Sequence, residues 1–183
     1  MNPSPNLFLI GPMGAGKSSI GRRLAEHFGM PCVDLDAAVE ERTGASVATI
    51  FEIEGEAGFR RRESDLLAEL SARDGIVLAT GGGAVLAPEN HVLLRERGFV
   101  VWLRTSVEQQ LQRLVRDRQR PLLDTPDRRE RLEQLARERD PVYRELADFV
   151  VASTEESCQH AAMRIAALLE QHWRRAPTTK ATA

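Results

Sequence analysis

The sequence has 183 residues, 42% of them hydrophobic, and is long enough to bury the core of one domain. Its 25 basic and 27 acidic residues leave a formal net charge of −2, so no overall field favours nucleic acid or an anionic membrane. The two cysteines, Cys32 and Cys158, are too far apart to indicate a disulfide framework or a metal-binding motif. An anionic ligand must therefore be held by a local group of residues.

The sequence carries no pattern typical of membrane insertion or secretion. No apolar run approaches the ~20 residues that span a bilayer, and the start, MNPSPN, lacks the basic and apolar regions of a signal peptide. Aromatic residues make up 5% of the chain, too few for a platform that stacks RNA bases. We therefore expect a cytoplasmic monomer that binds neither membrane nor nucleic acid.

Short apolar runs alternate with stretches of helical periodicity along the chain. The runs, which predict buried parallel strands, lie at 7–10, 32–35, 76–79, 99–103 and 149–151. Apolar residues at helical spacing predict helices after the first run, over 56–73, around 111–115, around 132–135 and around 165–173. This order predicts an α/β fold in which right-handed crossovers build a parallel sheet covered on both faces. We expect one domain over residues 1–175 and a disordered tail over 176–183.

One charged stretch breaks this pattern. Residues 116–131, RDRQRPLLDTPDRRER, contain Pro121 and Pro126, which interrupt any helix. Such a stretch is not expected to pack into a core, so it covers the surface or moves over a site. Composition alone favours a solvated connection between two helices.

The sequence GPMGAGKSS, residues 11–19, predicts a phosphate-binding loop. It satisfies G-x-x-x-x-G-K-[ST] at Gly11, Gly16, Lys17 and Ser18, and it lies between a predicted strand and an amphipathic helix. In such a loop, backbone N–H groups surround phosphate oxygens, Lys17 reaches the β- and γ-phosphates, and the Ser18 hydroxyl binds Mg²⁺. A glycine-rich turn that only connects strand to helix is the weaker alternative, because it does not explain the lysine and the serine.

The loop alone does not distinguish a kinase from a GTPase or a motor. A Ras-type GTPase reads guanine through N-K-x-D, but the one lysine besides Lys17 is Lys180, in the polar tail. Motors and large ATPases are usually longer than this chain. A small kinase fits best, and the acceptor of the phosphoryl group remains to be found.

The sequence VDLD places Asp34 and Asp36 at the end of the second predicted strand. Side chains two residues apart on a strand point the same way, so both carboxylates are expected to face the crevice at the carboxyl edge of the sheet. One can hold water around Mg²⁺, and the other can orient a substrate hydroxyl and accept its proton. Capping of the helix that follows is the alternative for Asp36.

Two further stretches fit an acceptor site. In GEAGFRRRESDLL, Arg60 and Glu63 are three residues apart and lie on one side of a helix. In IVLATGGGAV, the glycines 81–83 follow a strand and allow a ligand to lie directly against backbone. A strained turn after the strand would give the same glycine pattern.

In their order along the chain, these motifs resemble those of the shikimate kinases. The resemblance runs from about Leu7 to Ala147 through GPMGAGKSSIGRRLA, VDLD, SVATIFEIEGEAGFRRRE, TGGGAV, RPLL and RERDPVYRELA. It implies a P-loop kinase-type, three-layer α/β/α sandwich with a five-stranded parallel sheet and a mobile lid at about residues 114–126. Ser19 departs from the threonine expected at its position but keeps the hydroxyl.

The resemblance also implies a role for each matching residue. ATP would be bound by the loop and two arginines: Gly14, Ala15, Gly16, Lys17, Ser18, Ser19, Arg113 near adenine, and Arg120 on the lid. Shikimate would be bound through its carboxylate by Arg60 and Arg139, and through its hydroxyls by Asp36 and the Gly82 backbone. Mg²⁺ would be held by Ser18 and, through water, by Asp34. The catalytic groups would be Asp36, Lys17 and Arg120, and the charged stretch would then be a lid rather than a passive connection.

The implied reaction transfers the γ-phosphoryl group of ATP to the 3-hydroxyl of shikimate, in aromatic amino acid biosynthesis. A kinase for another small polyol, such as gluconate, would share the loop and the lid but would not need Arg60, Gly82 and Arg139 together. A regulatory module that binds ATP without catalysis is the alternative from another class. It would show no acceptor-dependent release of ADP.

Overall fold

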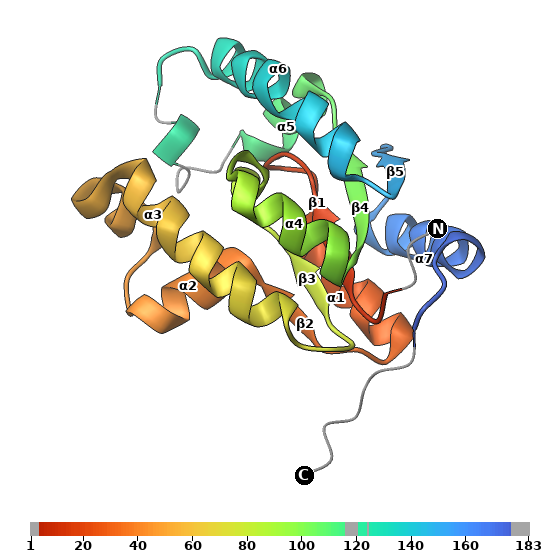
Figure 1. Ribbon diagram of the computed structural model, residues 1–183. Helices are drawn as coiled ribbons and strands as arrows, with labels where there is room; N and C mark the ends of the chain where they lie inside the picture. The colour runs from red at the N-terminus through yellow and green to blue at the C-terminus, as the bar shows by residue number, and fades with distance from the viewer. Residues whose placement is uncertain (1–3, 116–120, 124, 177–183) are drawn as a thin grey trace.

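The computed structural model describes residues 4–115, 121–123 and 125–176 and contains one parallel sheet of five strands (Figure 1). The strand order is β2-β3-β1-β4-β5. The strands are β1 (Leu7–Ile10), β2 (Cys32–Asp34), β3 (Val77–Ala79), β4 (Phe99–Arg104) and β5 (Phe149–Ala152). The five predicted strands are thus confirmed to within one residue at either end, as is the parallel sheet.

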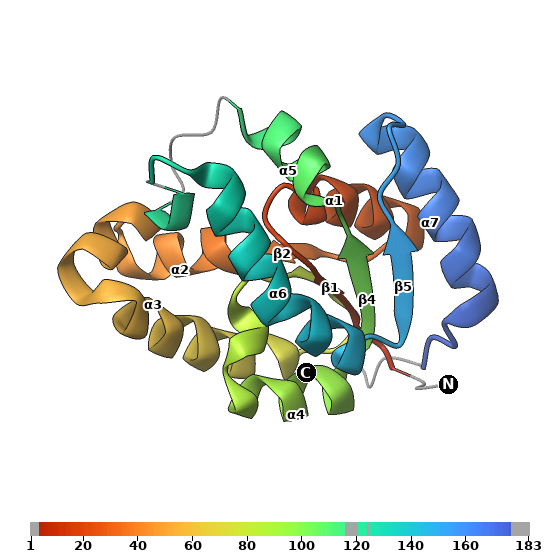
Figure 2. The same cartoon turned by 90° about the horizontal axis from the view of Figure 1, so that it is seen from above.

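Helices cover both faces of the sheet, which confirms the three-layer sandwich. Figure 2 shows α1 and α7 on one face and α3, α4 and α6 on the other. The helices are α1 (Lys17–Phe28), α2 (Leu35–Thr43), α3 (Val47–Ser71), α4 (Pro88–Arg97), α5 (Val107–Leu114), α6 (Arg128–Leu146) and α7 (Cys158–His172), with short 3₁₀ turns η1 (Ala84–Leu86) and η2 (Pro121–Leu123). Every helix in the described ranges is too short or too polar to span a bilayer.

The two faces of the sheet bury separate apolar clusters, because alternate residues of a strand point to opposite faces. In β1, Phe8 and Ile10 pack with side chains of α3, α4 and α6, whereas Leu7 and Leu9 pack with side chains of α1 and α7. All four are fully buried. This packing fixes the carboxyl end of β1, where the glycine-rich loop begins.

Helix α2 begins earlier than the sequence pattern predicts. The second apolar run predicts strand up to residue 35, but β2 ends at Asp34, whose side chain accepts a hydrogen bond from the Ala37 N–H and caps α2. Asp36 therefore lies in the first turn of a helix and not at a strand end. The capping role assigned to Asp36 as an alternative belongs to Asp34.

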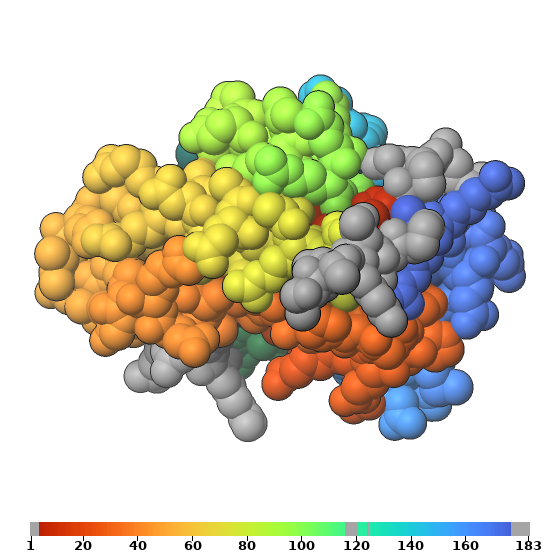
Figure 3. Space-filling model, turned by 60° about the horizontal axis from the view of Figure 1, so that its bottom comes forward, coloured from red at the N-terminus to blue at the C-terminus, as the bar shows by residue number. Residues whose placement is uncertain are grey.

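Helix α3 is kinked near its middle. Gly55 has φ 69° and ψ 179°, a conformation open mainly to glycine. The kink folds Glu54 back over the next turn, where a Cβ on Gly58 would collide with it, and lets Glu54 pair with Arg62 at 2.7 Å. In Figure 3, α2 and the first turns of α3 (orange) form one end of the molecule, opposite α7 (blue).

Part of the charged stretch packs into the molecule. Leu123, in η2, is 1% exposed and lies in an apolar cluster with Met13, Leu132 and Leu135. The prediction that this stretch stays out of the core is therefore wrong at Leu123, because its PLL segment carries enough apolar surface to be buried. Residues 116–120 and 124 of the predicted lid, and residues 177–183 of the predicted tail, lie outside the described part of the chain.

Candidate active site

The candidate site lies at the carboxyl edge of the sheet, where the chain order reverses. From β1, the central strand, the chain passes to β2 and β3 on one side and only later to β4 and β5 on the other. Open α/β sheets bind ligands in the crevice at such a reversal. The loop after β1 lies there, with the turn after β3 on one side and the loop after β5 on the other.

The loop between β1 and α1 has the geometry of a phosphate cradle. Gly11, Gly14 and Gly16 have positive φ values of 140°, 77° and 85°, which turn the backbone tightly into α1. The first turn of α1 has no acidic residue, and its N-cap, Gly16, makes no side-chain capping bond. Its N–H groups and the positive end of the helix dipole are thus suited to an anion. The Lys17 ammonium donates to the carbonyls of Gly11 and Pro12 at 2.7 and 2.9 Å, across the mouth of the loop.

Ser18 and Asp34 meet beside the loop. The Ser18 hydroxyl donates to Asp34 Oδ2, while Asp34 Oδ1 accepts from the backbone at the start of α2. Mg²⁺ in a nucleotide site takes most of its ligands from phosphates and water and needs few from the protein. One hydroxyl and one carboxylate fit that requirement. The two residues to which the resemblance assigns Mg²⁺ thus lie side by side, although the carboxylate also caps α2.

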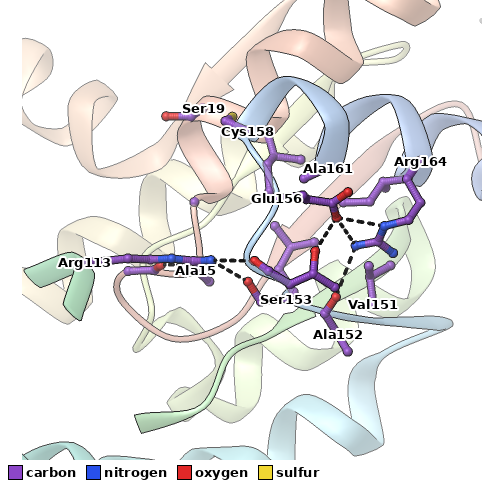
Figure 4. Close-up of a pocket in the computed structure, with 16 residues that line it drawn as sticks. Ala15, Ser19, Arg113, Val151, Ala152, Ser153, Glu156, Cys158, Ala161 and Arg164 are labelled. Carbon is purple, nitrogen blue, oxygen red and sulfur yellow. Dashed lines mark hydrogen bonds and ion pairs between the residues drawn. The ribbon is translucent and has the colours of Figure 1, made fainter. Parts of the chain in front are cut away.

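A cavity of about 230 Å³ opens on the β5 side of the loop (Figure 4). Gly14, Ala15, Gly16 and Ser19 line it from the loop and α1, and the segment after β5 closes the opposite wall. Glu156, in that segment, accepts hydrogen bonds from the Arg164 guanidinium and from the Thr154 hydroxyl. The distance from Arg164 Nη2 is 2.7 Å. The sequence analysis did not identify this wall, although its place after a strand at the carboxyl edge was a usable signal.

Arg113, on α5, joins the two walls of the cavity. Its guanidinium donates to the Gly14 carbonyl at 3.0 Å and to the Ser153 hydroxyl at 2.8 Å, as Figure 4 shows for Ser153. The side chain therefore bridges the glycine-rich loop and the loop after β5. This position, at the mouth of a cavity beside the phosphate cradle, agrees with a role next to a nucleotide base.

On the other side of the loop, α3 presents an arginine and a buried glutamate. Arg60 contacts Glu63 at 2.6 Å and Glu56 at 3.0 Å, and Glu63 is fully buried. Burial opposes the charge of Arg60, but the two carboxylates hold the pKa of its guanidinium above the ordinary value. Burial raises the pKa of Glu63, with Asp36 adding to the rise and Arg60 opposing it. The predicted Arg60–Glu63 proximity is confirmed.

A second arginine reaches the same place from α6. Arg139 is 4% exposed, and its Nη1 lies 3.6 Å from the point that a Cβ on Gly82 would occupy. Burial, helped by the nearby charge of Arg60, lowers the pKa of Arg139. Its buried Nε has no hydrogen-bond partner among the residues that the structure describes. Two cations held together in this way favour an anion between them.

The glycine turn after β3 lies directly against these cations and carboxylates. A Cβ on Gly83 would overlap the Arg60 guanidinium, and a Cβ on Gly81 would overlap Glu63 and come within 2.7 Å of Asp36 Oδ1. Side chains from α2 and α3 therefore come this close to the turn only because Gly81 and Gly83 have no side chains. This close approach favours the interpretation that the three glycines leave room for a ligand against the backbone, rather than the interpretation that they only form a strained turn.

The structure brings most of the predicted site residues to one edge of the sheet. Asp36, Arg60, Gly82 and Arg139 gather on the β3 side of the loop, and Arg113 and Ser19 lie on the β5 side. Arg120 lies outside the described residues. Sequence reasoning missed Glu63 as a member of the site, although its spacing from Arg60 was the available signal. It also missed Tyr143, whose hydroxyl donates a hydrogen bond to the Gly82 carbonyl.

Comparison with known proteins agrees with this arrangement. A family model described as shikimate kinase matches residues 13–170. A shikimate kinase of Stenotrophomonas maltophilia is 51% identical over 179 residues, which cover 98% of this chain and 99% of that protein. A shikimate kinase of Methylococcus capsulatus is 56% identical over 160 residues, covering 87% of this chain and 89% of that protein.

A solved structure extends the likeness to three dimensions. Shikimate kinase from Acinetobacter baumannii, determined in complex with shikimate, superposes with a TM-score of 0.89 at 46% identity. The match covers 92% of this chain and 94% of that one. The likeness in fold therefore extends over most of the chain.

Proposed function

Because this chain belongs to the shikimate kinase family, and is thus an ATP-dependent kinase, we propose that it phosphorylates the 3-hydroxyl of shikimate. The products would be shikimate 3-phosphate and ADP. One observation carries the choice of acceptor: the buried guanidinium group of Arg139 and the half-buried one of Arg60 meet at a bare glycine turn beside Asp36. A small hydroxy acid offers a carboxylate to Arg60 and Arg139 and a hydroxyl to Asp36.

Recognition of the acceptor would rest mainly on charge. Arg60 and Arg139 would hold the carboxylate, and the Gly82 backbone would lie against the ring hydroxyls. A hydrogen bond that involves a charged group contributes about 1.5–3 kcal/mol. Loss of either guanidinium should therefore weaken binding by about tenfold or more.

ATP would lie on the other side of the glycine-rich loop. Lys17, whose ammonium reaches across the loop mouth, would exchange its carbonyl partners for the β- and γ-phosphates. Gly14, Ala15, Gly16, Ser18 and Ser19 would surround the phosphates. The cavity bridged by Arg113 would take the base. Arg120, on the predicted lid, is assigned to the phosphates by the resemblance alone and stays a prediction.

The chain offers Mg²⁺ a suitable place. Ser18 and Asp34 already contact each other beside the loop, so a hydroxyl and a carboxylate converge where the phosphates would lie. When bound there, the ion would neutralise charge on the transferring phosphoryl group.

Asp36 would orient the acceptor hydroxyl and take its proton. Its carboxylate lies next to the glycine turn, within 2.7 Å of the point that a Cβ on Gly81 would occupy. A carboxylate in hydrogen-bonding reach of an alcohol holds it in line with the phosphorus and removes its proton as the new bond forms. Most of the catalysis would then come from positioning and charge neutralisation.

A coupled assay of ADP release tests the proposal. Shikimate should stimulate ADP release by the wild-type protein far more than gluconate or other hydroxy acids do. Asp36→Asn keeps the shape of the side chain and should lower kcat by about 10²-fold or more, the usual contribution of a general base. Equal stimulation by gluconate would point to another polyol kinase. No stimulation by any acceptor, with Asp36→Asn like the wild type, would leave a nucleotide-binding module without catalysis.

A further inference from the structure

The carbonyl groups of the three glycines after β3 have different partners. Backbone N–H groups of η1 donate to the two outer carbonyls, of Gly81 at 3.2 Å and of Gly83 at 3.0 Å. The middle carbonyl, of Gly82, accepts instead from the hydroxyl of Tyr143, which comes from α6. The peptide at the centre of the turn is thus held by a side chain 61 residues away in sequence.

This contact sets the direction of the whole peptide. The bond between Gly82 and Gly83 is trans, so its C=O and N–H point in opposite directions. With the carbonyl held by Tyr143, the Gly83 N–H is fixed on the other side of the peptide. Glycine restricts the backbone less than any other residue. A turn of three glycines therefore needs a hydrogen bond from another part of the chain to keep one conformation.

Tyr143 is itself firmly placed. Its side chain is fully buried, and its ring centroid lies 5.7 Å from that of Trp102. Burial raises the pKa of Tyr143, and the charge of Arg139 only partly opposes the rise, so the phenol keeps its proton at neutral pH. The hydroxyl can therefore always donate to the turn.

The same hydroxyl faces the acceptor-site arginine. Arg139 lies four residues before Tyr143, about one turn of α6 away, and both residues line the same small cavity beside the glycine-rich loop. The guanidinium also lies against Gly82, 3.6 Å from the point that a Cβ would occupy. One buried hydroxyl therefore contacts the glycine turn and lies beside the cation that faces it.

We infer that Tyr143 is a positioning residue of the acceptor site, which fixes the Gly82–Gly83 peptide relative to Arg139. The inference rests on the proposed function, because it assigns the turn and the arginine to the hydroxy acid. A tyrosine that served the core alone would be replaced by phenylalanine without consequence for the acceptor. The ring packs on Trp102 in either case, and only the hydroxyl reaches Gly82.

Tyr143→Phe separates the two roles. We expect the KM for shikimate to rise by about tenfold, as for the loss of one buried hydrogen bond, with the KM for ATP within twofold of the wild type. Leu146→Ala is the matched control, because Leu146 is buried in the same core three residues further along α6 and has no hydroxyl to donate to the turn. It should lower the melting temperature and leave the KM for shikimate unchanged. An unchanged KM for shikimate in Tyr143→Phe would overturn the inference, as would an equal rise in Leu146→Ala.

A second measurement needs no variant. Tyr143 is the one tyrosine of the chain, so protein grown with tyrosine ¹³C-labelled at Cζ gives a single resonance. That resonance should shift when shikimate saturates the protein and stay in place when ADP alone is added. If the chemical shift of this resonance does not change when shikimate is added, the inference is contradicted, even if Tyr143→Phe fails to fold. Failure of the proposed function is read separately, from wild-type protein that does not turn over shikimate.

Discussion

Charge is unevenly balanced among the side chains of the acceptor site. Arg60 has two carboxylates within ion-pair distance, whereas Arg139 reaches Gly82 and Tyr143. Glu63 is the buried carboxylate of this group; it pairs with Arg60, and the like charge of the nearby Asp36 opposes its ionisation. Burying an ion costs free energy even when it is paired. These buried charges therefore lower the stability of the free protein at the place where they would attract a bound ligand.

The raised pKa of Glu63 predicts how stability changes with pH. A carboxyl group whose pKa is higher in the native than in the unfolded protein binds its proton more tightly when folded. Its contribution to stability is therefore complete at low pH and is lost as the pH rises above about 4.3, the ordinary value, and through the native pKa. Each unit between the two pKa values corresponds to about 1.4 kcal/mol.

Glu63→Gln removes this dependence. In urea unfolding without ligand, the stability of the wild type relative to Glu63→Gln should fall as the pH is raised. Glu63→Gln also loses the contact with Arg60. That loss shifts the free energy of unfolding of the variant by the same amount at every pH, so it does not change how the difference from the wild type varies with pH. Glu52→Gln, which removes an exposed carboxyl group from the same helix, should leave the trend as in the wild type. Parallel curves for the wild type and Glu63→Gln would contradict the assigned pKa shift.

At the scale of elements, the kink in α3 decides where the acceptor-site residues lie. The first turns of α3 run up to Gly55, and the part after the kink carries Arg60 and Glu63 toward the glycine turn. Apart from its chain neighbours and the backbone of its own helix, no heavy atom of the described residues lies within 4 Å of a Cβ built on Gly55, so the glycine is required by its backbone angles and not by space. Gly44, after α2, is equally open but has φ 68° and ψ 12°, the left-handed helical region.

This pair predicts a difference in the cost of adding one methyl group. Gly55→Ala should lower the free energy of unfolding by about 3 kcal/mol, near the upper end of the range for backbone strain, and Gly44→Ala by about 1 kcal/mol. Urea denaturation of the two variants measures the difference. Because strain at Gly55 would move Arg60, the KM for shikimate should also rise in Gly55→Ala and not in Gly44→Ala. Equal costs would mean that α3 does not depend on this kink.

The sequence predicts elements better where apolar residues recur at a fixed period. All five strands and the helices α1, α3, α5, α6 and α7 follow from such runs, and the phosphate cradle follows from its motif and its place between strand and helix. Helix α4 is missed because one of its two buried residues is the polar Asn90, which leaves no apolar period, and α2 enters only as the helix that Asp36 could cap. The strand-based argument for Asp36 is wrong because Asp34 caps a helix one residue earlier than expected.

The acceptor site depends on contacts that no local pattern reveals. The pairing of Arg60 with Glu63 is visible as helical spacing, but the contact between Tyr143 and Gly82 joins α6 to the turn after β3. The burial of Leu123 likewise depends on Met13 and on α6, far away in sequence. Residue roles at such places come from the resemblance to a family or from the structure, and not from periodicity.

At the scale of the whole molecule, the two proposed sites lie on either side of one loop at the carboxyl edge of the sheet. The cavity bridged by Arg113 lies on the β5 side, and the arginine pair with Asp36 lies on the β3 side. Lys17 and Ser18 stand between them at the start of α1. A nucleotide in the cavity would thus direct its terminal phosphate toward the acceptor, which is the geometry that transfer between two bound substrates requires.

A crystal structure with shikimate and ADP tests this account most directly. It should show the shikimate carboxylate between Arg60 and Arg139, the 3-hydroxyl beside Asp36, and the phosphates of ADP on the loop with Lys17. If the two guanidinium groups point away from the organic anion, or if shikimate occupies the cavity beside Arg113, the assignment of the two sites is wrong.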